Sequence, residues 1–236
     1  MRSSARAITL TEVVFPGTGI LRDGLLILGF TGLTVIFAQI AIRLPFTTVP
    51  ITGQTLAVLL TGAALGSNRG ALSLLLYAVL GTMGAPVFAP SSAALQNQTV
   101  HLILPWQGTG KAIWELSSGG YILGFVFAAY VVGLLAERGW DRKAWVSAAM
   151  LVGNVILYVF GLAWLGYFIA SNQVIPGLGR TYQELIPGSS VLEKTLVGGL
   201  YPFIPGDLFK LVIASLVLPS AWELASRIKG RDSPKP

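Results

Sequence analysis

The chain has 236 residues, of which 53% are hydrophobic and only 11% charged, whereas an ordinary soluble domain is roughly 25% charged. A mean hydropathy of +0.71 excludes a soluble fold, and the absence of cysteine excludes disulfides, thiolate catalysis and Cys-ligated metals. The net charge of +6 comes from Lys and Arg in short loops and termini, which is typical of membrane orientation signals and does not indicate a nucleic-acid partner.

Apolar runs between charged or Pro/Gly-rich breaks predict an all-α, polytopic membrane protein with six transmembrane helices. Their ranges are 24–42, 53–66, 70–88, 120–136, 144–170 and 206–226. The first run is too long for the apolar core of a signal peptide, so we interpret it as a retained span. We expect one transmembrane domain over 1–236, with an N-terminal segment at 1–22 and a C-terminal tail at 227–236.

The second and third predicted helices are short for a bilayer that needs about 20 helical residues. Only Ser67, Asn68 and Arg69 separate them, which predicts a tight helical hairpin. Before this hairpin, the segment 44–54 contains two prolines and a glycine and cannot be regular helix throughout. Two interpretations stay open for it: a wall of a cavity at membrane depth, or an ordinary surface loop.

The distribution of Lys and Arg predicts that both termini are cytoplasmic. With the N-terminus inside, eleven basic residues fall on the cytoplasmic side and four outside, while Lys210 lies within the last span. The eleven are Arg2, Arg6, Arg22, Arg69, Arg138, Arg142, Lys143, Arg227, Lys229, Arg231 and Lys235, and the four are Arg43, Lys111, Arg180 and Lys194. The longer segments 89–118 and 171–205 should therefore lie outside.

Asp207 and Lys210 are the strongest candidates for a functional site. They are three residues apart near the start of the last predicted helix, so they share one face. Ionisable groups in a membrane segment are costly and rare unless they pair or face a polar cavity. We interpret them as a binding site for a small polar ligand, and a purely structural ion pair is the alternative.

A second candidate site is the start of the fourth predicted helix. Gly119 and Gly120 offer exposed backbone N–H groups to an electronegative ligand atom, and Tyr121 adds a flat ring with a hydroxyl. Helix packing is the alternative, because Gly120 and Gly124 form a small-xxx-small pair. Gln54 begins the second helix, where its amide can bind a ligand or simply be solvated.

The sequence contains no phosphate-binding loop, no metal-spaced His or carboxylate cluster and no Ser/His/Asp pattern. We therefore expect binding or transport instead of catalysis, with no cofactor and no metal. If ATP drives transport, another chain must hydrolyse it.

Several motifs together resemble the BioY biotin transporter family. They lie at 50–60, 66–70, 76–81, 86–89, 119–125 and 205–210, and include the runs PITGQTLAVLL, GGYILGF and PGDLFK. The resemblance covers most of the chain, in the order expected for that family.

This resemblance implies biotin uptake by a substrate-binding S component of an energy-coupling-factor transporter, multi-pass in the plasma membrane of a prokaryote. It implies that Asp207 and Lys210 contact the polar parts of biotin, that Tyr121, Gly119 and Gly120 line the pocket, and that Gln54 lies on its lid side. Expected partners are biotin, the lipid bilayer, and a transmembrane coupling subunit with ATPase subunits. An S component for another small vitamin, or a non-transporting membrane scaffold, are the alternatives.

Overall fold

The computed structural model describes residues 8–91, 99–142 and 145–231, and its elements are almost all helices. The helices are α1 (Leu10–Val14), α2 (Ile20–Ala38), α3 (Gln54–Leu65), α4 (Ser67–Thr82), α5 (Gly119–Ala136), α6 (Trp145–Ala170), α7 (Tyr182–Leu185), α8 (Val191–Gly199) and α9 (Ile204–Arg231), with a 3-10 turn at Ile113–Glu115. Three strands of two residues each complete the fold: β1 (Ala41–Ile42), β2 (Ile51–Thr52) and β3 (Val100–His101).

Each of the six predicted helix ranges overlaps one helix: α2, α3, α4, α5, α6 and α9. Four of these are long and apolar enough to cross a bilayer, namely α2, α5, α6 and α9. The other two have 12 and 16 residues and fall short of a full span. The helical, membrane-type fold is therefore confirmed, and the number of spans stays a prediction.

The hairpin between α3 and α4 is tighter than the sequence suggested. Only Gly66 separates the two helices, and its φ of +83° favours glycine. Ser67, expected in the connection, instead begins α4, and the carboxylate of Glu137 accepts hydrogen bonds from its backbone N–H at 2.8 Å and its hydroxyl at 2.9 Å. The prediction that residues 67–69 form a linker was wrong, because the Glu137 carboxylate, which directly follows α5, caps the start of α4.

Two predicted helix ends were also wrong. The first helix ends at Ala38 and not at 42, because Ala41 and Ile42 pair as β1 with β2 on one side and β3 on the other, both antiparallel. The third ends at Thr82 instead of 88, since Gly84 adopts φ +101° and Pro86 follows. The small sheet thus connects the segment after α2 with residues near 100.

Helix α5 lies in the middle of the bundle and packs against α3, α4 and α6. Glycines make these approaches close: a Cβ on Gly62 would lie 2.5 Å from the carbonyl oxygen of Ala129. Helix α2, in contrast, lies at the edge of the bundle, and its side chains Ile20 and Leu21 are 94% and 75% exposed. An apolar surface of this kind fits contact with lipid.

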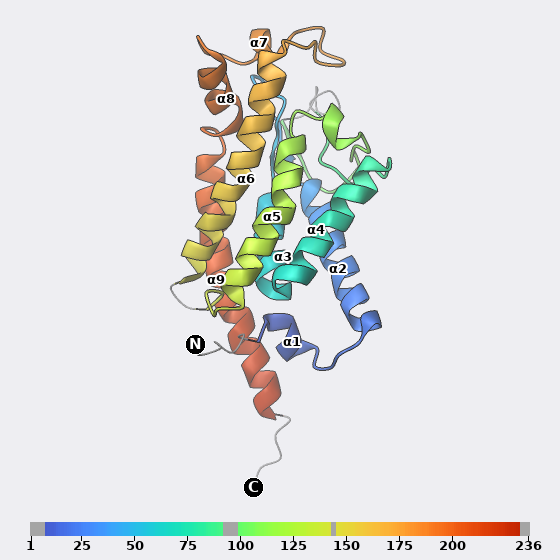
Figure 1. Ribbon diagram of the computed structural model, residues 1–236, viewed down its shortest axis with the longest axis vertical. Helices are drawn as coiled ribbons and strands as arrows, with labels where there is room; N and C mark the ends of the chain where they lie inside the picture. The colour runs from blue at the N-terminus through green and yellow to red at the C-terminus, as the bar shows by residue number, and fades with distance from the viewer. Residues whose placement is uncertain (1–7, 92–98, 143–144, 232–236) are drawn as a thin grey trace, which may run out of the picture.

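The chain's described ends meet at one end of the bundle. Figure 1 shows α1 and the C-terminal end of α9 at one end, and α7 and α8 at the other. Helix α1 is held there by the Thr11 hydroxyl, which donates to the carbonyl of Ala64 at 2.9 Å, and by an ion pair of Glu12 with Arg69 at 2.5 Å. The predicted basic residues Arg2, Arg6, Lys143 and Lys235 lie outside the described residues.

Candidate functional site

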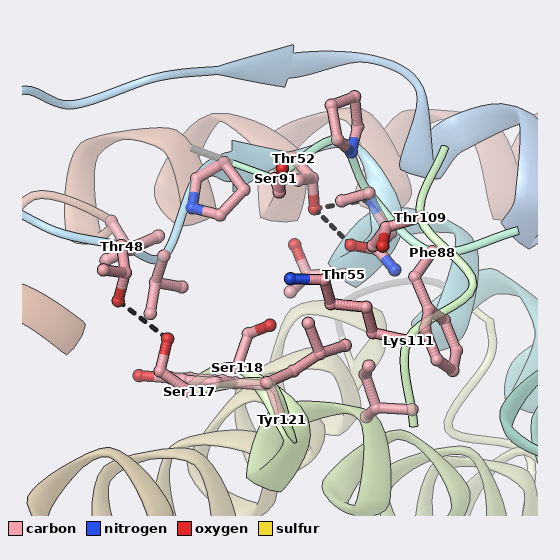
Figure 2. Close-up of a pocket in the computed structure, with 18 of the residues that line it drawn as sticks. Thr48, Thr52, Thr55, Phe88, Ser91, Thr109, Lys111, Ser117, Ser118 and Tyr121 are labelled. Atoms are coloured by element: carbon pink, nitrogen blue, oxygen red, sulfur yellow. Dashed lines mark hydrogen bonds between the residues drawn. The ribbon is translucent and has the colours of Figure 1, made fainter. Parts of the chain in front are cut away.

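A cavity of about 130 Å³ opens between the starts of α3, α5 and α9 and the middle of α6. This volume is several times the roughly 10–15 Å³ that one buried water needs, so the cavity is large enough for a small organic ligand. Aromatic and aliphatic side chains form much of its wall, and hydroxyls and four charged groups complete it. Figure 2 shows several of the hydroxyls together with Lys111. The apolar wall includes Val49, Phe88, Leu116, Ile122, Phe125, Leu157, Ile175 and Phe203.

Asp207 and Lys210 both line this cavity, as one polar cluster. The Lys210 ammonium lies 3.1 Å from the Asp207 carboxylate and 2.7 Å from the Thr55 hydroxyl. The other Asp207 oxygen accepts a short hydrogen bond from the Tyr158 hydroxyl. The two charged side chains are 9% and 13% exposed, so the pair is largely removed from water. Groups from α3, α6 and α9 therefore converge on one ion pair.

Tyr121 and Gln54 also line the cavity. The Tyr121 hydroxyl donates to the carbonyl of Gly199 at 2.7 Å, which leaves the face of its ring to the cavity wall. The Gln54 amide donates to the Tyr77 hydroxyl at 2.6 Å and accepts from the Thr52 hydroxyl at 2.9 Å. Gln54 is only 6% exposed, so the alternative of a solvated helix start does not hold.

Gly119 and Gly120 lie next to the cavity but outside its lining. A Cβ on Gly120 would come within 2.2 Å of the Trp164 Cβ, and one on Gly119 within 2.1 Å of the Ile113 carbonyl oxygen. Both glycines allow close packing of α5 against α6 and the 3-10 turn, as the packing alternative expects, and their contact with a ligand stays a prediction. Ser118, just before them, lines the cavity.

The Pro-rich segment 44–54 forms part of the cavity, so the surface-loop alternative is not what the structure has. Thr48, Val49, Pro50 and Thr52 line it. The Thr48 hydroxyl shares a hydrogen bond of 2.7 Å with Ser117, drawn in Figure 2, and joins this segment to the start of α5.

Two further contacts hold the same end of the cavity. The Thr47 hydroxyl donates to the carbonyl of Gly198 at 2.7 Å and so ties the Pro-rich segment to α8. The second contact is the hydrogen bond between Tyr182, in α7, and Ser117. This hydrogen bond lowers the pKa of the Tyr182 hydroxyl, but burial raises that pKa by more, so the hydroxyl stays neutral at the cavity wall.

Sequence reasoning missed Tyr158 and Thr55, which complete the Asp207 cluster. Each is far from Asp207 in the chain, so no local spacing signals the contact. The available signal was a hydroxyl within an otherwise apolar helix, a position where a polar group in lipid needs a partner.

Two more charged residues, Lys111 and Glu115, line the cavity and are exposed. Within the described ranges, no group of three or more His, Cys, Asp or Glu side chains could hold a metal ion. The arrangement suits non-covalent capture of a small molecule with both polar and apolar parts.

The BioY family model matches residues 5–227, nearly the full length. The chain belongs to the BioY family. Among curated relatives, the biotin transporter BioY of Rhizobium etli is 32% identical over 78% of this chain and 88% of its own length. The biotin transporters BioY of Thermotoga maritima and Rhodobacter capsulatus are 32% and 35% identical, over 80% and 72% of this chain and 88% and 76% of their own lengths.

The fold of this BioY family member also resembles a solved structure. The crystal structure of the S-component for biotin from an ECF-type ABC transporter matches with a TM-score of 0.61 at 20% identity. The match covers 88% of this chain and 95% of the other, so the two share a fold over almost their whole lengths.

Proposed function

We propose that this chain binds biotin in the cavity and carries it across the plasma membrane of a prokaryote as a substrate-specific S component. The observation that carries the proposal is the Asp207–Lys210 pair, which faces a ligand-sized cavity within apolar helices. The names of the relatives supply the substrate: three of them are biotin transporters with 32–35% identity to this chain.

The chemistry of the cavity fits the chemistry of biotin. Biotin has a ureido group with two N–H donors and one carbonyl acceptor, a thioether ring, and an apolar chain that ends in a carboxylate. The cluster of Asp207, Lys210 and Thr55 offers both acceptors and donors, and the aromatic wall offers an apolar surface to the ring and the chain. In this proposal Tyr121 and Gln54 contact the ligand from the wall, and Gly119 and Gly120 act by packing.

We further propose six spans in a single domain, with both termini in the cytoplasm. The eleven-to-four excess of basic residues supports this, as does the meeting of α1 and the end of α9 at one end of the bundle. Helices α3 and α4 are short. Helix α3 is largely buried beside α5 and can cross within protein, whereas α4 packs on α5 with one face and exposes Leu72, Leu75 and Val79 on another.

The chain has no cysteine, so single cysteines test this topology directly. Arg138 and Arg180 are both exposed, the first between α5 and α6 and the second between α6 and α7. In intact cells, a membrane-impermeant maleimide should label Arg180→Cys and not Arg138→Cys. Labelling of Arg138→Cys alone would reverse the proposed orientation.

We propose a transmembrane coupling subunit and ATPase subunits as partners, because the solved structure with this fold is an S-component of an ECF-type ABC transporter and the sequence has no nucleotide-binding loop of its own. The test compares the uptake of labelled biotin by cells that express the chain alone and by cells that also express candidate partners. The difference measures whether the chain needs these partners.

Calorimetric titration of the purified protein with biotin tests the substrate, with Lys210→Ala as the comparison. Wild type should bind, and the variant should bind much more weakly because it leaves Asp207 without its ammonium partner. Binding of thiamine or riboflavin in place of biotin would favour an S component for another vitamin. Failure of wild type to bind any of them would favour the scaffold alternative.

A further inference from the structure

The charges that line the cavity are not equivalent. Lys210 and Asp207 form a close pair, with the ammonium also bound to Thr55. Lys111 and Glu115 are the other two, and among the residues that the structure describes neither side chain forms a hydrogen bond or ion pair. The positive charge of Lys210 is therefore already balanced, while that of Lys111 is available to a ligand.

The segment that carries Lys111 is fixed in place. Phe88 and Thr109 exchange backbone hydrogen bonds of 3.0 and 3.1 Å. A Cβ on Gly110 would lie 2.2 Å from the carbonyl oxygen of Gly84, so the chain just before Lys111 lies directly on the turn after α4. The backbone of Lys111 is thus anchored, and Figure 2 shows its side chain reaching into the cavity from the side of Phe88 and Thr109.

A carboxylate that enters this cavity loses hydration and needs a cation. Placing it at Lys210 would set two carboxylates, the ligand's and that of Asp207, against one ammonium, and like charges at short range are unfavourable. Lys111 offers an ammonium on a flexible stem and has no carboxylate to displace. The ligand's negative charge is thereby directed away from the Asp207 cluster.

We propose that Lys111 is the residue that binds the carboxylate of the substrate, so that it selects the acid over uncharged forms of the same molecule. This inference rests on the proposed function, since it takes biotin as the ligand. The orientation follows: the carboxylate end meets Lys111, and the ureido ring meets the cluster of Asp207, Lys210 and Thr55.

The test is calorimetric titration of purified wild type and Lys111→Met with two ligands, biotin and biotinamide, in which the carboxylate is an uncharged amide. Lys111→Met should lower the affinity for biotin about tenfold. This is the lower end of the range for a hydrogen bond to a charged group, and we expect it because Lys111 is exposed and solvent screens its charge. Binding of biotinamide should not change. Lys111→Arg should retain the preference for biotin.

Arg180→Met is the matched control, because it removes one exposed positive charge on the same predicted side but outside the cavity lining. It should leave both affinities unchanged. Glu115→Gln should not weaken biotin, since it removes a negative charge from the cavity wall.

Two results would overturn the inference while leaving the proposed function intact: unchanged biotin affinity in Lys111→Met, or equal weakening of biotin and biotinamide. If wild type binds neither ligand, the proposed function itself fails. The experiment therefore distinguishes a wrong assignment of Lys111 from a wrong proposed function.

Discussion

Replacing Lys210 with methionine separates the folding role of the ion pair from its role in binding. The change keeps a long apolar stem but leaves the Asp207 carboxylate, 9% exposed, without its cation. Breaking a buried pair from one side costs about 3–5 kcal/mol. Because Tyr158 and Thr55 still donate to Asp207, we expect the lower figure, about 3 kcal/mol.

The measurement is thermal unfolding of the purified protein in detergent. For a chain of this size, about 1 kcal/mol corresponds to roughly 2–4 °C, so Lys210→Met should melt about 6–12 °C below wild type. Adding Asp207→Asn removes the unpaired charge and keeps an acceptor for Tyr158. The double variant should recover at least half of the lost stability, since it restores neutrality at the site.

Arg227→Met provides the control within the same helix. Arg227 pairs with Glu223 at 2.6 Å, but their side chains are 73% and 65% exposed, and such pairs contribute well under 1 kcal/mol. Equal melting temperatures of Lys210→Met and Arg227→Met would show that breaking the buried pair costs no more than breaking the exposed one. A double variant less stable than Lys210→Met would show that the unpaired charge of Asp207 is not what destabilises the single variant.

Two further predictions concern other parts of the fold. Gly120→Ala puts a methyl group 2.2 Å from the Trp164 Cβ and should cost about 1–3 kcal/mol in the same assay, whereas Gly24→Ala, with no atom within 4 Å, should not lower the melting temperature. Burial raises the pKa of Asp141 above its ordinary value of 3.8, and the hydrogen bond from Trp222 opposes this rise only in part. Ionisation of the Asp141 carboxyl therefore destabilises the folded state as pH rises. Melting curves of Asp141→Asn should match wild type near pH 4 and lie above it at pH 7.

The parts of the site that the sequence could predict are those governed by local rules. A charge in an apolar run is costly wherever the chain folds, and a spacing of three residues puts two side chains on one helical face, so Asp207 and Lys210 were identifiable. The six helices followed from apolar runs for the same reason, since lipid imposes the pattern residue by residue.

The parts that could not be predicted depend on contacts between distant segments. The strand β1 pairs with β3, and the resulting sheet ends the first helix four residues early. Nothing in residues 39–42 encodes that partner. Likewise, whether Gly120 serves a ligand or a neighbouring helix depends on where Trp164 lies, and both alternatives had the same local sequence.

The energetics of the Asp207–Lys210 pair connect the fold to its function. A buried ion pair is often no more stable than apolar side chains of the same volume, so stability alone does not explain two charges and two hydroxyls among these helices. The cluster also opens onto a cavity, where a polar ligand can use donors and acceptors that the protein has already ordered. On this reasoning the double variant Asp207→Asn, Lys210→Met should regain stability and still fail to bind biotin. If it recovered both, the pair would be structural and the cavity would bind by its apolar wall alone.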